Sequence, residues 1–221
     1  MKKLNRILLS FAVAVGFAAS AYAQMGMGMR PPQIPGEFKP VVGSGVQYKM
    51  TTKQGDMDMA YAVVGKETVE GADGYWLEMR MLGGKGAGTI TKMLMVMSGS
   101  QPGPKRMIVW VPPRPPMEMP MNMMGMARGM AQNAPKSGGG AKDLGQVVGT
   151  ETITVPAGTF ETTHYRSAQG GDIWVSSKVS PYGIVKMTSP DMSMELEKVL
   201  TNETSQIKGE PQKMEFPGMP H

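Results

Sequence analysis

The sequence predicts an all-β protein built mainly from antiparallel strands. Short runs of alternating apolar and polar residues recur from Val46 onward, which is the period of a strand with one buried face. Glycine and proline, 29 and 18 of the 221 residues, separate these runs and favour tight turns between neighbouring strands. No segment of ordinary helix length carries an amphipathic helical pattern. Such a sheet can cover its apolar face as a sandwich, a closed barrel or an open half-barrel.

The N-terminus has the pattern of a cleaved secretory signal peptide over residues 1–23. Lys2, Lys3 and Arg6 precede an apolar run over residues 7–19, and a small-x-small cleavage site follows at residues 21–23. The apolar run is too short for a permanent membrane helix. We therefore expect a periplasmic mature chain that does not span a membrane. Because the sequence contains no cysteine, neither lipid attachment at a cysteine nor a disulfide framework is available.

The basic charge of the sequence belongs mostly to this leader. The leader holds three of the 23 basic residues and none of the 18 acidic ones, which leaves a net charge of +2 on the mature chain. A balance so close to neutral gives no support for a nucleic-acid partner.

The first half of the mature chain starts with an arm and continues as strands. Residues 24–45 contain too much Pro and Gly for a regular element, so we expect a flexible, extended N-terminal arm. Two strands should follow, over residues 56–64 and 75–82, joined by a turn-rich connection at residues 65–74. The residues that share one face of the first strand are Met57, Met59, Tyr61 and Val63. In the second strand, Tyr75, Leu77, Met79 and Met81 share one face, and Trp76, Glu78 and Arg80 lie opposite.

The next two runs, residues 89–97 and 105–111, predict a further hairpin. In the first of them one face carries Met93, Met95 and Met97, and the other carries Leu94 and Val96. A strand that is apolar on both faces is expected to be central and covered on both sides. Residues 112–145 then form one long Met- and Gly-rich loop, which contains a candidate short helix at residues 122–132.

Hairpins return in the second half of the chain. Turns at residues 156–158, 180–183 and 189–191 punctuate five further strands. The last strand alternates Met192, Met194 and Leu196 with polar residues. Residues 205–221 are polar and Pro-rich, and we expect a flexible C-terminal tail there. Residues 46–204 are thus predicted to form a single antiparallel β domain.

One stretch carries a family resemblance. Residues 155–187, "VPAGTFETTHYRSAQGGDIWVSSKVSPYGIVKM", combine a Val-Pro-Ala-Gly-Thr-Phe hairpin with a Pro-x-Gly-Ile-Val-Lys turn. They resemble the C-terminal hairpins of secreted bacterial proteins related to the LolA and LolB lipoprotein carriers, including uncharacterised relatives. The resemblance implies a curved antiparallel sheet forming an open, incomplete β-barrel with few or no helices. In the carriers, the apolar concavity of this barrel shelters acyl chains.

The alternation and the resemblance together predict a non-catalytic periplasmic binding protein for an apolar ligand such as a lipid or acyl chain. Methionine is common on the predicted apolar faces, and its flexible side chain adapts to ligands of different shape. The predicted cavity residues are Met57, Met59, Tyr61, Tyr75, Leu77, Met79, Met81, Met93, Met95, Met97, Met192, Met194 and Leu196.

The methionine-rich stretch at residues 116–130 lies where a flap over this concavity would have to be. The predicted lid residues are Met117, Met119, Met121, Met123, Met124, Met126 and Met130. Thioether sulfur also binds Cu(I) and Ag(I), so a periplasmic protein for these ions is an alternative hypothesis. Its candidate ligands are Met25, Met27, Met29, Met117, Met119 and Met121. An envelope scaffold that meets another protein through a flat apolar strand face is a third hypothesis, and no cofactor is expected.

No catalytic constellation is visible in the sequence. His164 and Arg166 share a strand parity with Thr162, which places the imidazole on a polar face. The other histidine is the C-terminal residue, so His164 has no second histidine in the domain with which to form a metal pair or a triad. We therefore expect a surface or packing role for His164 and no enzyme activity.

Overall fold

The computed structural model describes residues 37–97, 103–119, 144–167 and 170–213. All of them belong to one compact unit. The predicted signal peptide, Met25, Met27 and Met29 lie outside the described residues, as do the lid methionines from Met121 to Met130 and the candidate helix at 122–132.

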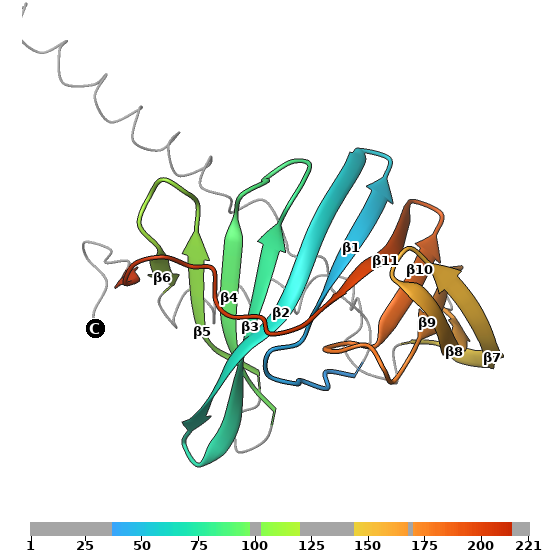
Figure 1. The fold of residues 1–221 in the computed structure, drawn as a ribbon, viewed down its shortest axis with the longest axis horizontal. Helices are drawn as coiled ribbons and strands as arrows, with labels where there is room; N and C mark the ends of the chain where they lie inside the picture. Colours follow the sequence, from blue (N-terminus) through green and yellow to red (C-terminus); the bar gives the residue numbers. More distant parts are fainter. Residues whose placement is uncertain (1–36, 98–102, 120–143, 168–169, 214–221) are drawn as a thin grey trace, which may run out of the picture. The chain divides into compact units, whose positions relative to one another are not determined.

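The described residues form a twelve-stranded sheet and no helix, which confirms the predicted all-β class (Figure 1). The strands follow one another in the sheet in the order β12-β6-β5-β4-β3-β2-β1-β11-β10-β9-β8-β7. Every pair is antiparallel except β12 with β6, and the sheet does not close into a barrel. The strands are β1 Gly45–Thr52, β2 Gly55–Val69, β3 Ala72–Met81, β4 Ile90–Val96, β5 Gly103–Trp110, β6 Met117–Met119, β7 Gln146–Val155, β8 Gly158–Arg166, β9 Asp172–Val175, β10 Ile184–Ser189, β11 Met192–Leu200 and β12 Gln212–Lys213.

The sheet curls at its β7 end. The turn between β7 and β8 returns to β11, where the Ala157 amide donates to the Leu196 carbonyl at 3.2 Å. Since β8 and β11 are separated by two strands in the sheet, this contact requires the strands between them to bend. Residues of this hairpin, Val155 and Phe160 among them, therefore pack on the same core as the middle strands.

The β2–β3 hairpin is longer than the sequence indicated. Residues 65–74 were expected as a connection, but β2 continues to Val69 and the turn is confined to Glu70 and Gly71, both with positive φ. The polar side chains of this extension pair across the two strands, with Lys66 Nζ 2.9 Å from Asp73 Oδ2. A two-stranded extension of this kind does not need an apolar face. Its sequence therefore lacks the alternation of apolar and polar residues from which strands are predicted.

A strand also interrupts the predicted loop at residues 112–145. Met117–Met119 pair with β5 as β6, and β12 adds to the outer side of β6. Arg106 on β5 holds Glu118 through two hydrogen bonds of 2.8 and 3.0 Å. Three residues are too few to show a strand period, and this cross-strand ion pair was not apparent from the sequence.

The main hydrophobic core lies on one face of the sheet. It includes the alternating residues predicted on β2 and β3, such as Met59, Tyr61 and Leu77, which are at most 4% exposed. A second, smaller cluster on the opposite face contains Trp76, Leu94 and Ile108. Since Met93 and Met95 pack on the main core and Leu94 on the other cluster, β4 is covered on both sides as predicted.

A C-terminal strap, residues 201–211, crosses the second face on its way from β11 to β12 (Figure 1). Glu78 is fully buried beneath it and accepts hydrogen bonds from Arg80, the Ser205 hydroxyl and the Gln206 amide. Arg80 also donates to Glu203 at 2.5 Å. The sequence predicts a flexible tail from residue 205 onward. In the structure, however, hydrogen bonds connect residues 203–206 to β3.

Candidate ligand-binding site

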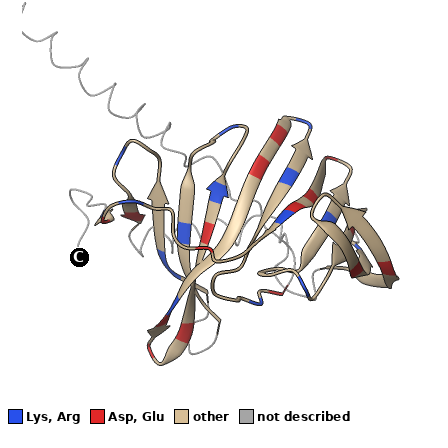
Figure 2. Cartoon of the chain, viewed as in Figure 1, with Lys and Arg blue, Asp and Glu red and all other residues tan. Residues whose placement is uncertain are grey.

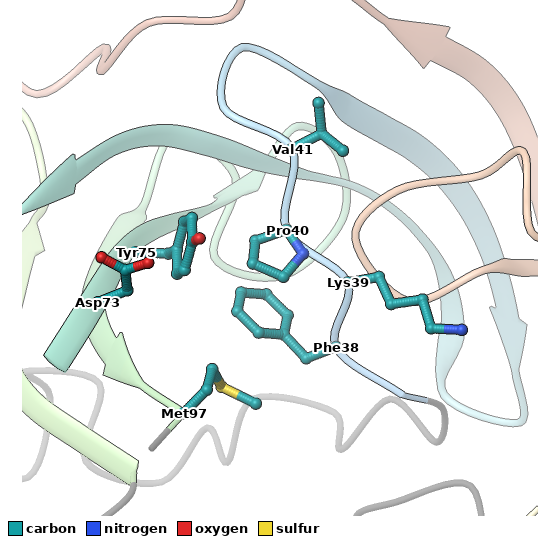
Figure 3. Close-up of a pocket in the computed structure, with 7 residues that line it drawn as sticks. All are labelled: Phe38, Lys39, Pro40, Val41, Asp73, Tyr75 and Met97. Carbon is teal, nitrogen blue, oxygen red and sulfur yellow. The ribbon is translucent and has the colours of Figure 1, made fainter. Parts of the chain in front are cut away.

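An open pocket of about 390 Å³ lies where the segment before β1 meets the end of the β2–β3 hairpin (Figure 3). Its volume is within the range of roughly 300–1,000 Å³ found for small-molecule sites. Phe38 and Pro40 project toward Tyr75 and Met97 across this space. The lining residues are Phe38, Lys39, Pro40, Val41, Asp73, Tyr75 and Met97.

The pocket exposes apolar surface to solvent. Val41 is 59% exposed and Met97 is 48% exposed, and both belong to the small set of large apolar side chains that the described residues leave in water. Water in contact with such surface is displaced favourably by an apolar ligand. The lining therefore suits a hydrocarbon group.

The segment of residues 37–44, which we call the cover, is held by hydrogen bonds and not by strand pairing. The Lys39 amide donates to the Pro181 carbonyl at 2.8 Å, and the Ser180 hydroxyl donates to the Lys39 carbonyl at 3.1 Å. Near its C-terminal end, the Gly43 amide donates to the Val63 carbonyl at 2.7 Å. The cover thus rests on β2 and on the loop at residues 180–182, and Phe38 near its start packs against the main core.

Behind Phe38, a row of aromatic rings leads into the core. The Phe38 and Tyr182 ring centroids are 5.4 Å apart, Tyr182 and Tyr61 are 6.3 Å apart, and Tyr61 and Tyr48 are also 6.3 Å apart. Desolvation by burial raises the pKa of Tyr182 to about 12. Burial raises the pKa values of Tyr48 and Tyr61 still further, so all three phenols are uncharged hydrogen-bond donors.

The Tyr61 hydroxyl is buried without a hydrogen-bond partner, and it is the single side-chain polar atom of this kind among the described residues. The neighbouring Tyr48 hydroxyl, by contrast, donates to the Ile184 carbonyl at 2.9 Å. An unpaired buried hydroxyl costs free energy that a bound acceptor would recover.

The charged groups of the pocket are neutralised by neighbours. Asp73 pairs with Lys66, whose pKa is raised chiefly by its hydrogen bond to that carboxylate. Lys39 pairs with Glu37 at 3.0 Å, and Figure 3 shows its side chain directed away from Met97. The pocket therefore carries no net charge, which favours the uncharged part of a ligand.

Most of the predicted cavity residues lie in the main core. Met59, Tyr61, Leu77, Met79, Met81, Met194 and Leu196 are buried in it, and Met57, Tyr75, Met93, Met95 and Met192 pack against it. Of the thirteen predicted residues, Tyr75 and Met97 line the pocket. The structure thus uses the methionine-rich face chiefly to fill the core, because the β7–β8 hairpin and the cover pack onto it.

The pocket residues of the cover are not among the predicted cavity residues. Phe38, Pro40 and Val41 lie in a Pro- and Gly-rich stretch whose composition predicts a flexible, extended arm. The available signal was the presence of Phe38, Val41 and Val42 in an otherwise polar and flexible segment, since apolar residues there need a surface to contact.

Two of the predicted lid methionines, Met117 and Met119, form the ends of β6. The remaining lid residues, and the other candidate soft-metal ligands, lie outside the described residues. Among the residues that the structure describes, no group of three or more His, Asp or Glu side chains is arranged to hold a metal ion.

His164 lies on β8 between two carboxylates. Its Nε2 is 2.8 Å from Asp172 Oδ1, its Nδ1 is 3.0 Å from Glu151 Oε1, and its ring stacks on Trp174 at 4.6 Å. The hydrogen bond with His164 is the main cause that lowers the pKa of Asp172. The Thr162 hydroxyl, two residues away on β8, is buried and donates to the Glu151 carbonyl. The contacts of His164 therefore connect β8 with β7 and β9.

Comparison with known proteins gives distant structural neighbours. No family of known sequences matches the chain, and no curated protein does. A provisionally assigned lipoprotein from Parabacteroides distasonis is 18% identical with a TM-score of 0.36, over 76% of this chain and 100% of that one.

Two further structures belong to the same group of neighbours. One is a provisionally assigned exported protein with a YmcC-like fold from Bacteroides fragilis, 13% identical, TM-score 0.36, over 75% of this chain and 99% of that one. The other is a provisionally assigned outer membrane lipoprotein-sorting domain from Vibrio parahaemolyticus, 10% identical, TM-score 0.29, over 72% and 84%. Since every TM-score is below 0.5, these neighbours support no inference about ligand or partner.

Within the described ranges, the structure contains no helix with the length and apolar character that crossing a membrane requires. Figure 2 shows acidic and basic residues interspersed along the described strands.

Proposed function

We propose that this protein is a non-catalytic envelope protein that binds an apolar ligand, a lipid or acyl chain, in the pocket beneath the cover. The ligand is an apolar small molecule and no cofactor takes part. The chain acts in the periplasm after export through its N-terminal signal peptide.

One observation carries this proposal. The pocket of about 390 Å³ combines a lining that is more apolar than polar with neutralised charges, and it leaves Val41 and Met97 roughly half exposed to water. A folded protein gains nothing in stability from apolar surface kept in water, whereas a hydrocarbon ligand removes that surface from solvent.

The binding energy comes from burial of hydrocarbon. Each methylene transferred from water contributes about 0.8 kcal/mol, so six methylenes in the pocket contribute about 5 kcal/mol before the cost of association. Phe38, Tyr75 and Met97 supply the contact surface, and the flexible thioether of Met97 adapts to chains of different shape. The cover can move to admit a chain because hydrogen bonds and the ring contact of Phe38 with Tyr182, and not strand pairing, hold it at Phe38 and Lys39.

The proposal is tested by titrating the mature protein with a neutral fluorescent apolar probe such as phenylnaphthylamine. The informative variant is Met97→Asp, which places a carboxylate in the lining at a side chain that is already 48% exposed. Desolvating an unpaired polar group costs about 1–3 kcal/mol, and more when it is charged, so the Kd should rise on the order of tenfold to a hundredfold.

The matched control is Val147→Asp, because Val147 is 64% exposed on β7 and does not line the pocket. It should bind the probe as tightly as the wild type. Equal affinity in Met97→Asp and the wild type, or no saturable binding to the wild type, would reject the pocket as a ligand site.

A further inference from the structure

Three methionines of β5 and β6 stand apart from the other methionines of the sheet. Met107, Met117 and Met119 are each partly exposed, and neither hydrophobic cluster of the described residues includes them. The other described methionines are core residues or pack on the core, except Met97, which lines the pocket. Packing in the two hydrophobic clusters therefore does not account for Met107, Met117 and Met119. We call these three residues the thioether cluster.

Strand register brings the three side chains together on one face. Met107 is the direct partner of Met119, and Met117 is two residues from Met119 on the same strand. Directly opposite residues have Cβ atoms about 4.5–5.5 Å apart, and diagonal neighbours remain within reach of long side chains. Because methionine has three rotatable bonds, three sulfur atoms in this arrangement can converge on one point.

Two charged neighbours, Arg106 and Glu118, lie away from this face. Arg106 and Glu118 occupy the intervening positions of β5 and β6 and bind each other on the opposite side of the sheet, where Arg106 also lies 5.2 Å from the Trp76 ring. The thioether cluster therefore presents three neutral sulfur ligands without a fixed cation among them. Such a ligand set is typical of sites for soft monovalent ions.

We infer that Met107, Met117 and Met119 form a binding site for one soft monovalent metal ion, Cu(I) or Ag(I). The site shares no residue with the pocket beneath the cover, so it constitutes a second function of the sheet. It also differs from the ligand set that the sequence suggests, since Met107 comes from the neighbouring strand and was not apparent from Met-x-Met spacing.

The test uses Ag(I), which needs no reductant, and the mature protein with its methionine methyl groups labelled with ¹³C. Single Met→Leu substitutions assign the three methyl resonances, and titration with silver nitrate then reports which resonances shift. The site requires shifts of all three. Native mass spectrometry of the variant Met107→Leu/Met117→Leu/Met119→Leu should show one bound Ag(I) fewer per chain than the wild type.

The matched control is Met57→Leu/Met187→Leu/Met192→Leu, which removes three partly buried methionines that pack on the core. Leucine has nearly the volume of methionine, so both triple variants should keep the wild-type circular dichroism spectrum. The control should retain the full number of bound ions. Silver-induced shifts confined to other methionines, or the same Ag(I) count in both triple variants, would overturn the assignment.

Discussion

Replacing Tyr61 by Phe removes one oxygen atom from the core, and we expect it to stabilise the protein. The Tyr61 side chain is 4% exposed, and its hydroxyl is buried without a hydrogen-bond partner among the described residues. Leaving such a group unpaired costs about 1–3 kcal/mol, so its removal should raise the free energy of unfolding by up to that amount. In a domain of this size, 1 kcal/mol corresponds to roughly 2–4 °C in Tm.

Tyr48→Phe is the matched control with the opposite sign. The two rings are neighbours at 6.3 Å, and both side chains are buried, but the Tyr48 hydroxyl donates to the Ile184 carbonyl at 2.9 Å. Removing this hydrogen bond should lower the free energy of unfolding by about 0.5–1.5 kcal/mol.

Urea unfolding of the ligand-free protein, followed by tryptophan fluorescence, measures both changes. The midpoint should rise for Tyr61→Phe and fall for Tyr48→Phe at an unchanged slope. A fall of similar size in both variants would mean that the Tyr61 hydroxyl has an acceptor in the folded protein, and Tyr61→Phe would then not be stabilising.

Further predictions concern the ion pairs. Arg80→Met leaves Glu78 buried without its cation and should cost about 3–5 kcal/mol in urea unfolding, whereas Lys53→Met breaks an exposed pair with Asp191 and should cost at most about 1 kcal/mol. Similar costs in both would contradict the buried network. The hydrogen bond from Arg106 lowers the pKa of Glu118, so Glu118→Gln should destabilise the protein above pH 4.5. That difference should vanish as the pH falls through the lowered pKa, and a difference that persists in acid would exclude an ionic origin.

The alternation of buried and exposed residues along the strands could be predicted because it depends on neighbours in the sequence. Met59, Tyr61 and Val63 are buried as their alternation indicated, since one face of β2 meets the core. The predicted coverage of β4 on both faces is likewise confirmed by Met93 and Leu94, which pack on opposite clusters.

The buried polar network could not be predicted, because its partners are distant in the sequence. Glu203 is 123 residues from Arg80, and Gln206 is 128 residues from Glu78. No local pattern marks such pairs, and the strap that brings them together has the composition of a tail.

The candidate site was only partly predictable for the same reason. Tyr75 and Met97 follow from the strand pattern, but the opposite wall of the pocket comes from Phe38 and Pro40. Their contacts depend on where residues 180–182 place the cover, which is a consequence of tertiary structure and not of periodicity.

Native mass spectrometry of the mature protein, purified from the periplasm of its own host, shows whether the pocket holds a lipid in the cell. The wild type and Val147→Asp should carry a bound lipid mass, and Met97→Asp should lose it, because only the last substitution changes the pocket. A wild type without any bound lipid, or a Met97→Asp protein that retains the same lipid to the same extent, would contradict the account.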